Sequence, residues 1–554
     1  MKSKIHEHQL DSNFSVVSNK LFFIAFLLLS CYGYSQEDAW VYFNDKPNAS
    51  TQLNTPLNFL TQRALDRRTN QGITLSENDM PIHQPYIDGI IASNGITVMA
   101  KSKWLNCLHV QGSVNDINAL TLLPYVNRVQ FADASLNSKK PRPKTITPVN
   151  KQMDVLTDFN YGNSANQIQM LNGHLLHQAN YTGTDKIIAV LDSGFINVNT
   201  TAPFQRLFDN NLILGGYNFV SQNTNVYSLH NHGTLTLSCM GGYVDGELVG
   251  TAPDAQYYLF VTEDVAQESP VEESYWVEAA EEADRLGVDV ISTSLGYYQF
   301  DNPNYGHFYS EFTGDTAFAS KGANIAFSKG IVVVASAGNS GASPEPYNHV
   351  GVPAEALNVL AVGAVKSDEE YAAFSSIGPS FDGRIKPDVM AKGQGATVAN
   401  TSGNTQTASG TSFSCPIIAG MIASFWGAVP NLTSQQIVDF VKQSADRFTN
   451  PTNQYGYGIP DFQLALSNAL SLTDNAIGRF LVYPNPVSNE LFISFPANFN
   501  EARISFYNAL GQIIFEKTIQ TTANLLSMEN ISPGIYFYKI KSNSFTQTGK
   551  IIKN

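Results

Sequence analysis

Cysteine is scarce in this chain of 554 residues, which contains four. Cys31 lies in an apolar N-terminal stretch, and Cys107, Cys239 and Cys415 fall in three other segments. Such an odd and scattered set excludes a disulfide framework as the source of stability, so a large core must provide it. Cys239 and Cys415 lie on predicted apolar helices, and we expect both to be small buried side chains rather than partners in a disulfide bond.

Positive charge is also in short supply, with 33 Lys and Arg against 47 Asp and Glu and a formal net charge of −14. This balance argues against nucleic acid as the main partner and favours a soluble protein outside the cell or at its surface. The 43% of hydrophobic residues and the 40 glycines indicate a packed globular chain with many tight turns. Because single cores stop growing near about 250–300 residues, we expect a main domain with smaller ones attached.

The apolar run LFFIAFLLLS (21–30) is too short for a permanent membrane anchor. As a helix it would extend about 15 Å, against a hydrocarbon core of about 30 Å. Lys20 precedes the run and small or polar residues follow it, so residues 1–36 are predicted to be a secretory signal peptide cleaved near Gln36. Lipidation of Cys31 is the alternative, but a leucine two residues before it fits such a site poorly.

Residues 37–140 are predicted to form a small α+β module. Helical patterns over 59–72 and around 86–95 alternate with stretches typical of strands. The stretches typical of strands lie at 40–43, 73–76, 96–112 and 126–133. The segment SLNSKKPRPKTITPVN (135–150), rich in Pro, Lys and Ser, is predicted to be an exposed linker that is readily cut.

Residues 141–473 repeat a unit of an apolar strand, a glycine-rich turn and a helix. The strand patterns are KIIAVLDSG (186–194), QYYLFV (256–261), VDVISTSLG (288–296), IVVVASAGN (331–339) and NVLAVGAV (358–365). Uninterrupted Val and Ile runs are typical of strands covered on both faces, which predicts an α/β domain with a parallel sheet sandwiched by helices. Ligands of such folds bind beyond the carboxyl ends of the strands.

Residues 474–554 change character again. Apolar and polar positions alternate among β-branched and aromatic residues, as in YPNPVSNELFISF (483–495), which predicts a small antiparallel β-sandwich. The segment has no cluster of acid, histidine and serine suggestive of chemistry. A carbohydrate-binding module is one interpretation, although no exposed aromatic cluster is evident.

Polar residues stand where the predicted strands of the central segment end or its helices begin. Asp192 ends the run KIIAVLD before a turn at Gly194, and Asn339 follows IVVVASAG in a turn of small residues. His232 precedes a glycine and an apolar stretch, so its imidazole is expected on the first turn of a helix. Taken singly, each would be an ordinary cap, turn or surface residue.

Ser412 lies in the uncharged stretch ASGTSFSCPIIAG (408–420). Gly410 allows a sharp turn into a predicted buried helix beginning at Ser412, so that no neighbouring side chain crowds the hydroxyl. Pro416 is expected near the end of the first turn, where its missing N–H costs little.

Together, these four residues provide the groups that acyl transfer requires: a carboxylate, an imidazole, a hydroxyl and an amide donor. A serine hydroxyl needs a base, and the imidazole needs a carboxylate that fixes its tautomer, which predicts Ser412 as nucleophile, His232 as base and Asp192 as its orienter. The N–H of Ser412 at a helix N-terminus and the amide of Asn339 are expected to form the oxyanion hole.

With Asp192, His232, Asn339 and Ser412 in that order, the sequence resembles the subtilisin-like serine proteases. The fragments that carry the resemblance occur in family order: AVLDSG, HGT, GTAPDA (250–255), STSLG (292–296), ASAGNSG (335–341), FSSIGP (374–379), KPDVMA (386–391) and GTSFSCP (410–416). The resemblance implies a secreted serine endopeptidase that acts on protein or peptide substrates and requires no cofactor.

The resemblance also implies where substrate binds. Two short runs are expected to wall the peptide cleft: Ser294, Leu295 and Gly296 on one side, and Ser336, Ala337 and Gly338 on the other. These walls carry no charge, so we expect an apolar or aromatic residue on the acyl side of the cut bond. Phe195 after DSG departs from the family pattern without affecting the triad, whereas Tyr297 and Tyr298 after SLG bear on specificity.

The resemblance also implies roles for the N-terminal and C-terminal modules. The module at 37–140 resembles the inhibitory propeptide of such enzymes, a permanent accessory domain being the alternative. The motifs YPNP, NALGQ and SPGIYFYKI resemble the sorting domains of the type IX secretion route, which implies export across both membranes. Calcium stabilises many relatives, and the loop DNPNYG (301–306) has suitable oxygens, but the sequence assigns no metal ligand.

Two other functions deserve comparison with the protease. A catalytically silent surface or binding protein would share the fold, since fold alone does not imply chemistry. A serine esterase of the α/β-hydrolase type would use G-x-S-x-G and place its acid and histidine after the serine, and neither holds here.

Overall fold

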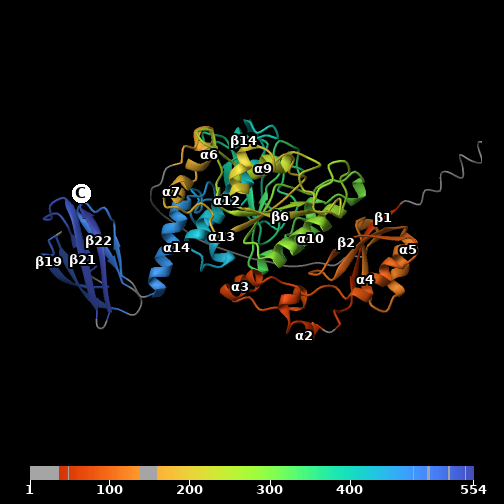
Figure 1. The fold of residues 1–554 in the computed structure, drawn as a ribbon, viewed down its shortest axis with the longest axis horizontal. Coiled ribbons are helices and arrows are strands. Elements are labelled where there is room, and N and C mark those ends of the chain that lie inside the picture. Colours follow the sequence, from red (N-terminus) through yellow and green to blue (C-terminus); the bar gives the residue numbers. More distant parts are fainter. Residues whose placement is uncertain are drawn as a thin grey trace, which may run out of the picture.

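The computed structural model describes residues 36–47, 49–137, 159–477, 480–495, 499–508, 510–521, 524–542 and 545–553. It contains an N-terminal body (residues 36–137), a central domain (159–477) and a C-terminal sandwich (480–553), which Figure 1 shows with the central domain in the middle. Residues 1–35 of the predicted signal peptide and most of the predicted linker lie outside the described residues.

The N-terminal body is built on a four-stranded antiparallel sheet of order β2-β3-β1-β4. Its strands are β1 (Glu37–Phe43), β2 (Ile96–Ser102), β3 (Cys107–Gly112) and β4 (Val126–Phe131), and its helices are α2 (Ala49–Gln52), α3 (Gln62–Asn70), α4 (Gln84–Ile91) and α5 (Val114–Ala119). Ile90 of α4 and Ile117 of α5 share a core with Val41 and Val110 of the sheet. The predicted α+β module is therefore confirmed.

One strand expected in this body is absent from the described structure. Residues 73–76 form no strand, because the N–H of Ile73 bonds back to the carbonyl of Arg68 at the end of α3 and Ser76 begins a one-turn helix, Glu77–Asp79. Residues 49–80, which we call the arm, thus run between β1 and α4 without joining the sheet.

The central domain contains the predicted parallel sheet, which has seven strands in the order β13-β12-β11-β10-β5-β9-β6. Its strands are β5 (Ile187–Asp192), β6 (Ile213–Asn218), β9 (Gln256–Val261), β10 (Val290–Thr293), β11 (Val332–Ser336), β12 (Leu360–Val365) and β13 (Val389–Lys392). The short antiparallel pairs are β7 (Tyr243–Val244) with β8 (Leu248–Val249) and β14 (Ala396–Ala399) with β15 (Thr405–Ala408).

Helices cover both faces of this sheet, and strands β5, β10, β11, β12 and β13 are buried along their whole length. Ile188 and Val190 face one core, whereas Ile187, Ala189 and Leu191 face the other. The first core contains α9 (His232–Gly241), α12 (Thr411–Ala428), α13 (Ser434–Gln443) and α14 (Phe462–Ile477); the second contains α10 (Val271–Leu286) and α11 (Phe318–Ser328). Shorter helices are α6 (Ala165–Gln169), α7 (Gly173–Gln178) and α8 (Gln205–Asp209).

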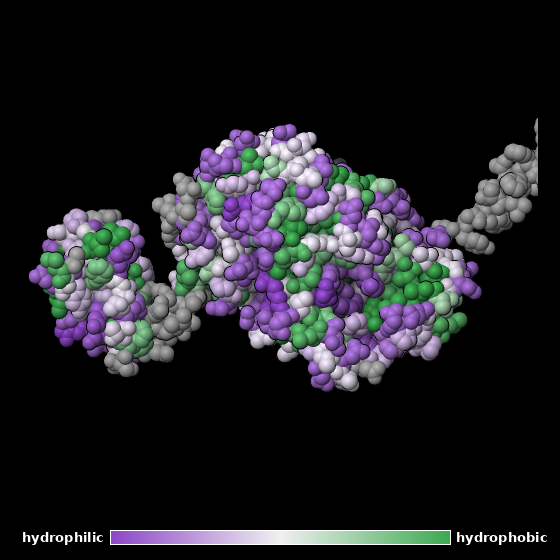
Figure 2. Space-filling model, viewed as in Figure 1, coloured by the Kyte–Doolittle hydropathy of each residue, from purple (hydrophilic) through white to green (hydrophobic). Residues whose placement is uncertain are grey.

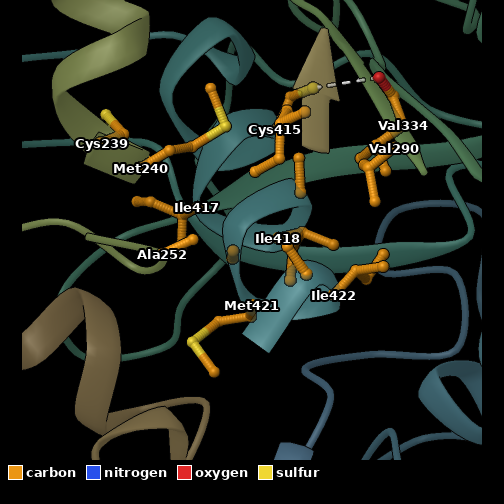
Figure 3. Packing of buried hydrophobic residues seen from close by; sticks show 14 of the residues in the cluster. Cys239, Met240, Ala252, Val290, Val334, Cys415, Ile417, Ile418, Met421 and Ile422 are labelled. Atoms are coloured by element: carbon orange, nitrogen blue, oxygen red, sulfur yellow. Dashed lines mark hydrogen bonds between the residues drawn. The ribbon is translucent and has the colours of Figure 1, made fainter. Parts of the chain in front are cut away.

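Helix α12 runs through the first core. Among the described helices it alone is long and apolar enough to cross a membrane, but it is almost entirely buried inside this domain. Figure 3 shows Cys415, Ile418 and Ile422 of α12 in the same core as Val290 and Val334, with a hydrogen bond of 3.5 Å from the Cys415 thiol to the carbonyl of Val334. Cys239 and Cys415 are free and fully buried, as expected.

The C-terminal sandwich confirms the predicted all-antiparallel segment. A three-stranded sheet (β16-β17-β20) and a four-stranded sheet (β19-β18-β21-β22) enclose a core of their own that includes Leu491, Ile504 and Ile540. The strands are β16 (Leu481–Tyr483), β17 (Glu490–Ser494), β18 (Glu501–Tyr507), β19 (Ile513–Gln520), β20 (Leu525–Ser527), β21 (Gly534–Ser542) and β22 (Phe545–Lys553).

Candidate active site

Asp192 is the last residue of the central strand β5, and its side chain is fully buried. The N–H of Ser193 donates to Oδ1 at 2.8 Å, and the hydroxyl of Thr236 donates to Oδ2 at 2.9 Å. Gly194 follows with φ +144°, and a Cβ there would lie 2.2 Å from the carbonyl oxygen of Ser228. Only glycine therefore allows the next loop to approach this close.

His232 begins helix α9 and points its ring at this carboxylate. Its Nδ1 lies 2.8 Å from Oδ1 of Asp192, and its side chain is 27% exposed, so one edge of the ring faces solvent. Burial lowers the pKa of His232, but the carboxylates of Asp192 and Glu263 more than offset this, so the pKa lies above the usual 6.5. The imidazole is therefore held in place by a fixed negative charge.

Ser412 lies in the first turn of α12, one residue after the helix begins at Thr411. The ring of the neighbouring Phe413 lies 6.1 Å from the imidazole of His232, measured between ring centroids, so the first turns of α9 and α12 are adjacent. The Ser412 hydroxyl is half-buried and donates to the carbonyl of Ser294 at 3.5 Å.

Pro416 has a different role from the one expected. It is the sixth residue of α12 rather than part of the first turn, and having no N–H it leaves the carbonyl of Ser412 without its helical donor. The hydroxyl of Ser294 donates to that carbonyl at 2.9 Å instead. Sequence reasoning missed this pair, since it joins residues from different units of the fold.

Asn339 follows strand β11, and its amide orientation is fixed by Thr411. Its Oδ1 accepts from the N–H and the hydroxyl of Thr411 at 2.9 and 3.1 Å, which directs Nδ2 away from that residue. A Cβ built on Gly410 would lie 3.6 Å from Nδ2 of Asn339 and 3.7 Å from the backbone nitrogen of Ser412. The two predicted oxyanion donors therefore lie close to the same side of Gly410.

A cavity of about 210 Å³ adjoins Ser412 and Asn339. All six residues predicted to wall the cleft line it: Ser294, Leu295, Gly296, Ser336, Ala337 and Gly338. Tyr297 and Tyr298 line it too, as do residues that the sequence did not indicate, including His349, Val352 and Ser376. His349 and Val352 belong to none of the sequence fragments quoted above, and Ser376 lies in FSSIGP (374–379), to which no role in the cleft was given.

Glu263 is a further residue that the sequence analysis missed. It lies two residues beyond β9 and is buried, and its Oε1 accepts from the hydroxyl of Tyr297 at 2.7 Å and from that of Thr262 at 2.8 Å. Burial raises the pKa of Glu263, and the two hydrogen bonds offset only part of that rise. Glu263 thus connects the pocket wall at Tyr297 to the electrostatics of His232.

Within the described part of the chain, no three His, Cys, Asp or Glu side chains are grouped so that they could hold a metal ion. The arrangement instead combines a buried carboxylate, an imidazole, a half-buried hydroxyl and two N–H donors around a cavity. Such a set is suited to nucleophilic attack on an acyl group. The individual roles remain predictions.

Comparisons with known proteins match three parts of the chain to family models. Residues 183–458 match the family model described as the subtilase family, residues 38–147 match the peptidase S8 propeptide domain of Bacteroidota, and residues 481–554 match the secretion system C-terminal sorting domain. Subtilisin NAT of Bacillus subtilis subsp. natto is 32% identical over 302 residues, which are 54% of this chain and 70% of that protein. Subtilisin of Bacillus pumilus is 31% identical over 302 residues, 54% of this chain and 97% of that protein. Among solved structures, MycP1 with the N-terminal propeptide removed covers 55% of this chain and 96% of its own, with a TM-score of 0.44 and 24% identity.

Proposed function

This chain belongs to the subtilase family, and we propose that it is a secreted serine endopeptidase that cuts peptide bonds through Asp192, His232 and Ser412. Its propeptide domain and its type IX secretion sorting domain indicate a protease precursor that is exported across the outer membrane to the cell surface or the medium. The observation that carries the proposal is the 2.8 Å contact between His232 and the buried Asp192, next to the first turn that bears Ser412.

The proposed reaction begins with the proton of Ser412. With Nδ1 of His232 donating to Asp192, Nε2 is the free base, and in the proposed reaction the Ser412 hydroxyl leaves the carbonyl of Ser294 and donates to that nitrogen. The oxygen then attacks the peptide carbonyl while His232 takes the proton. The imidazolium returns the proton to the leaving amine, and water, activated by the same base, hydrolyses the acyl-enzyme.

The negative charge of the tetrahedral intermediate would develop in the space beside Gly410. The N–H of Ser412, in the first turn of a long helix, and Nδ2 of Asn339 lie close to that space. The N-terminus of a helix favours a bound anion. The two hydrogen bonds from Thr411 fix the orientation of the Asn339 amide before substrate binds. Both donors are therefore preorganised.

The 210 Å³ cavity would bind the side chain on the acyl side of the cut bond. Leu295, Ala337 and Val352 provide apolar surface, and the hydroxyl of Tyr297 is engaged with Glu263. An apolar or aromatic residue is the proposed preference. The domain boundaries proposed for this precursor are 1–36, 37–140, 141–473 and 474–554, with the first segment removed as a signal peptide.

Labelling with a fluorophosphonate tests the catalytic proposal. We expect modification of Ser412 in processed protein, loss of the label in Ser412→Ala and in His232→Ala, and an unchanged label in Ser414→Ala, whose buried hydroxyl only caps a carbonyl in the same helix. Casein hydrolysis should likewise be retained in Ser414→Ala and lost in Ser412→Ala and His232→Ala. If processed wild-type protein takes no label, the catalytically silent alternative holds instead.

A further inference from the structure

The N-terminal body contacts the central domain at two separate places. At the first, its sheet lies on α10 and α11: Trp40 stacks on Phe318 with ring centroids 4.9 Å apart and donates from Nε1 to Ser274 at 2.9 Å. Glu281 accepts from the Ser102 hydroxyl at 2.7 Å and from the N–H of Trp104 at 2.9 Å. These groups are largely buried.

The second contact is made by the arm, residues 49–80. A cavity of about 840 Å³, lined by Phe59, Lys101 and Tyr258 among others, separates the two contacts, and Figure 2 shows the surface hollowed between them. Figure 1 shows α3 of the arm lying below α10, away from β1 and β2. The arm is therefore an independent attachment.

The arm binds at the amino ends of the parallel strands, opposite the edge that bears the catalytic residues. Arg63 donates to the carbonyl of Gly287, just before β10, at 3.0 Å. Gln71 donates to the carbonyl of Gly330, just before β11, at 2.9 Å and accepts from the N–H of Ser434 at the start of α13 at 2.8 Å. One segment thus holds together three parts of the central domain.

Buried ion pairs lie at the centre of this contact. Asp284, in the last turn of α10, is fully buried; Oδ1 pairs with Arg67, and Oδ2 lies 2.8 Å from Arg68. Arg68 also lies 2.6 Å from Asp79 of the arm, which lies 3.0 Å from Lys329 of the central domain. The charges on each side of the contact are neutralised by charges from the other.

Without the arm the central domain would be left with an uncompensated charge. In the described parts of the chain, both side-chain partners of Asp284 come from the arm. Loss of the arm would give up both of these ion pairs, whereas replacing an arginine in the docked arm would leave Asp284 desolvated with less counter-charge. The central domain therefore has a physical reason to keep the arm.

Keeping the arm does not obstruct the cleft. The residues that line the cavity beside Ser412 all belong to the central domain, between Ser294 and Ser412, and none belongs to residues 36–137. The described hydrogen bonds of Asp192, His232 and Asn339 likewise stay within the central domain.

We propose that residues 36–137 remain docked after the chain is cut in the predicted linker, and that the active enzyme is a two-chain complex anchored by the arm. This inference rests on the proposed function only in that a precursor is cut. The propeptide domain would then act as a lasting structural subunit.

The docking itself is tested without catalysis, in the Ser412→Ala variant carrying a recognition site for an added protease in residues 138–158. After cutting, the fragment that contains the arm is expected to co-elute with the central domain in size-exclusion chromatography. The double variant Arg67→Ala/Arg68→Ala should release it and lower the apparent Tm of the uncut protein by roughly 5–15 °C. Arg128→Ala, an exposed arginine of the same body that covers Tyr42, is the matched control and should retain the fragment.

Release of the fragment from the protein with an unaltered arm, while the central domain keeps its Tm, would overturn the proposal. Where the double arginine variant does not fold, Gln71→Ala removes only neutral hydrogen bonds. It is expected to shorten the lifetime of the cut complex several-fold, and an unchanged lifetime would contradict the arm as anchor.

Retention is tested in wild-type protein that has matured by itself. Intact mass and N-terminal sequencing of the fluorophosphonate-labelled peak should show one copy of a fragment spanning residues 49–80 for each labelled serine. Fully labelled and active protein without that fragment would refute retention. A retained fragment without any label would instead count against the proposed catalysis, so the two failures are distinct.

Discussion

Ser294 and Ser412 exchange hydrogen bonds between a pocket wall and the helix that bears the proposed nucleophile. The Ser294 hydroxyl donates to the carbonyl of Ser412 at 2.9 Å, and the Ser412 hydroxyl donates to the carbonyl of Ser294 at 3.5 Å. The first of these bonds exists because Pro416 cannot supply the usual helical N–H. The end of β10 is thereby linked to the first turn of α12.

Ser294→Ala should lower kcat by roughly 3- to 30-fold, because Ser412 would lose the group that positions its backbone. KM for short peptides should change less. Adding Pro416→Ala restores an N–H donor to the same carbonyl, so the double variant is expected to recover part of the lost kcat. Steady-state kinetics of both variants on one chromogenic peptide measures this, and equal kcat values in wild type and Ser294→Ala would contradict it.

The acid limb of kcat/KM should lie above pH 6.5. His232 acts as base only when neutral, and its pKa is raised by Asp192 and Glu263, so activity appears only as the pH rises through that higher value. Glu263→Gln keeps an acceptor for Tyr297 but removes the charge, and should move the limb to lower pH. A limb at the same pH in both proteins would show that Glu263 does not act on His232.

Asn339→Asp should lower kcat by roughly 10²- to 10³-fold with little change in KM. An aspartate still accepts the two hydrogen bonds from Thr411 but has no N–H for the oxyanion. Comparison with Asn339→Ala separates the two roles: a similar kcat in both variants indicates that donation to the oxyanion dominates. Wild-type kcat in Asn339→Asp would exclude the amide as an oxyanion donor.

The central domain should become less stable as the pH rises from about 6.5 toward 10. Burial lowers the pKa of His307, but Glu273 at 2.7 Å, together with Glu311, raises it to about 10. A histidine whose folded-state pKa is raised stabilises the fold fully below the unfolded pKa, and this stability is lost as the pH passes through the folded value.

Thermal unfolding of the Ser412→Ala protein measures this effect without self-digestion. The Tm is expected to fall by roughly 5 °C or more over that range. In His307→Gln the Tm should be lower at pH 6.5 and nearly flat up to pH 10. If the Tm of both proteins falls equally with rising pH, a group other than His307 causes the loss of stability.

The fold and the main site residues could be predicted because their signals are local. Uninterrupted apolar strands indicate a parallel sheet, and such a sheet gathers the residues at its carboxyl ends. Asp192 ends strand β5, Asn339 comes shortly after β11, and His232 and Ser412 lie in the first turns of helices. The topology thus accounts for the shared edge of Asp192 and Asn339, whereas the places of His232 and Ser412 depend also on how α9 and α12 pack.

The remaining features depend on contacts between distant segments. Nothing in the stretch around Arg67 and Arg68 indicates a partner such as Asp284, more than 200 positions later. Glu263 follows its strand as an acid among several, and only the fold shows that it bonds to Tyr297. Residues 73–76 resemble a strand in composition, but a bond back to α3 prevents them from joining the sheet.

The three described cysteines make the protein its own reporter of unfolding. Cys107 lies in the N-terminal body, Cys239 and Cys415 lie in the central domain, and burial raises the pKa of each thiol. A thiol-reactive dye should therefore not react with the native protein and should modify each body only when that body unfolds. Mass mapping of the modified peptides would then time the opening of each part separately, without any engineered probe.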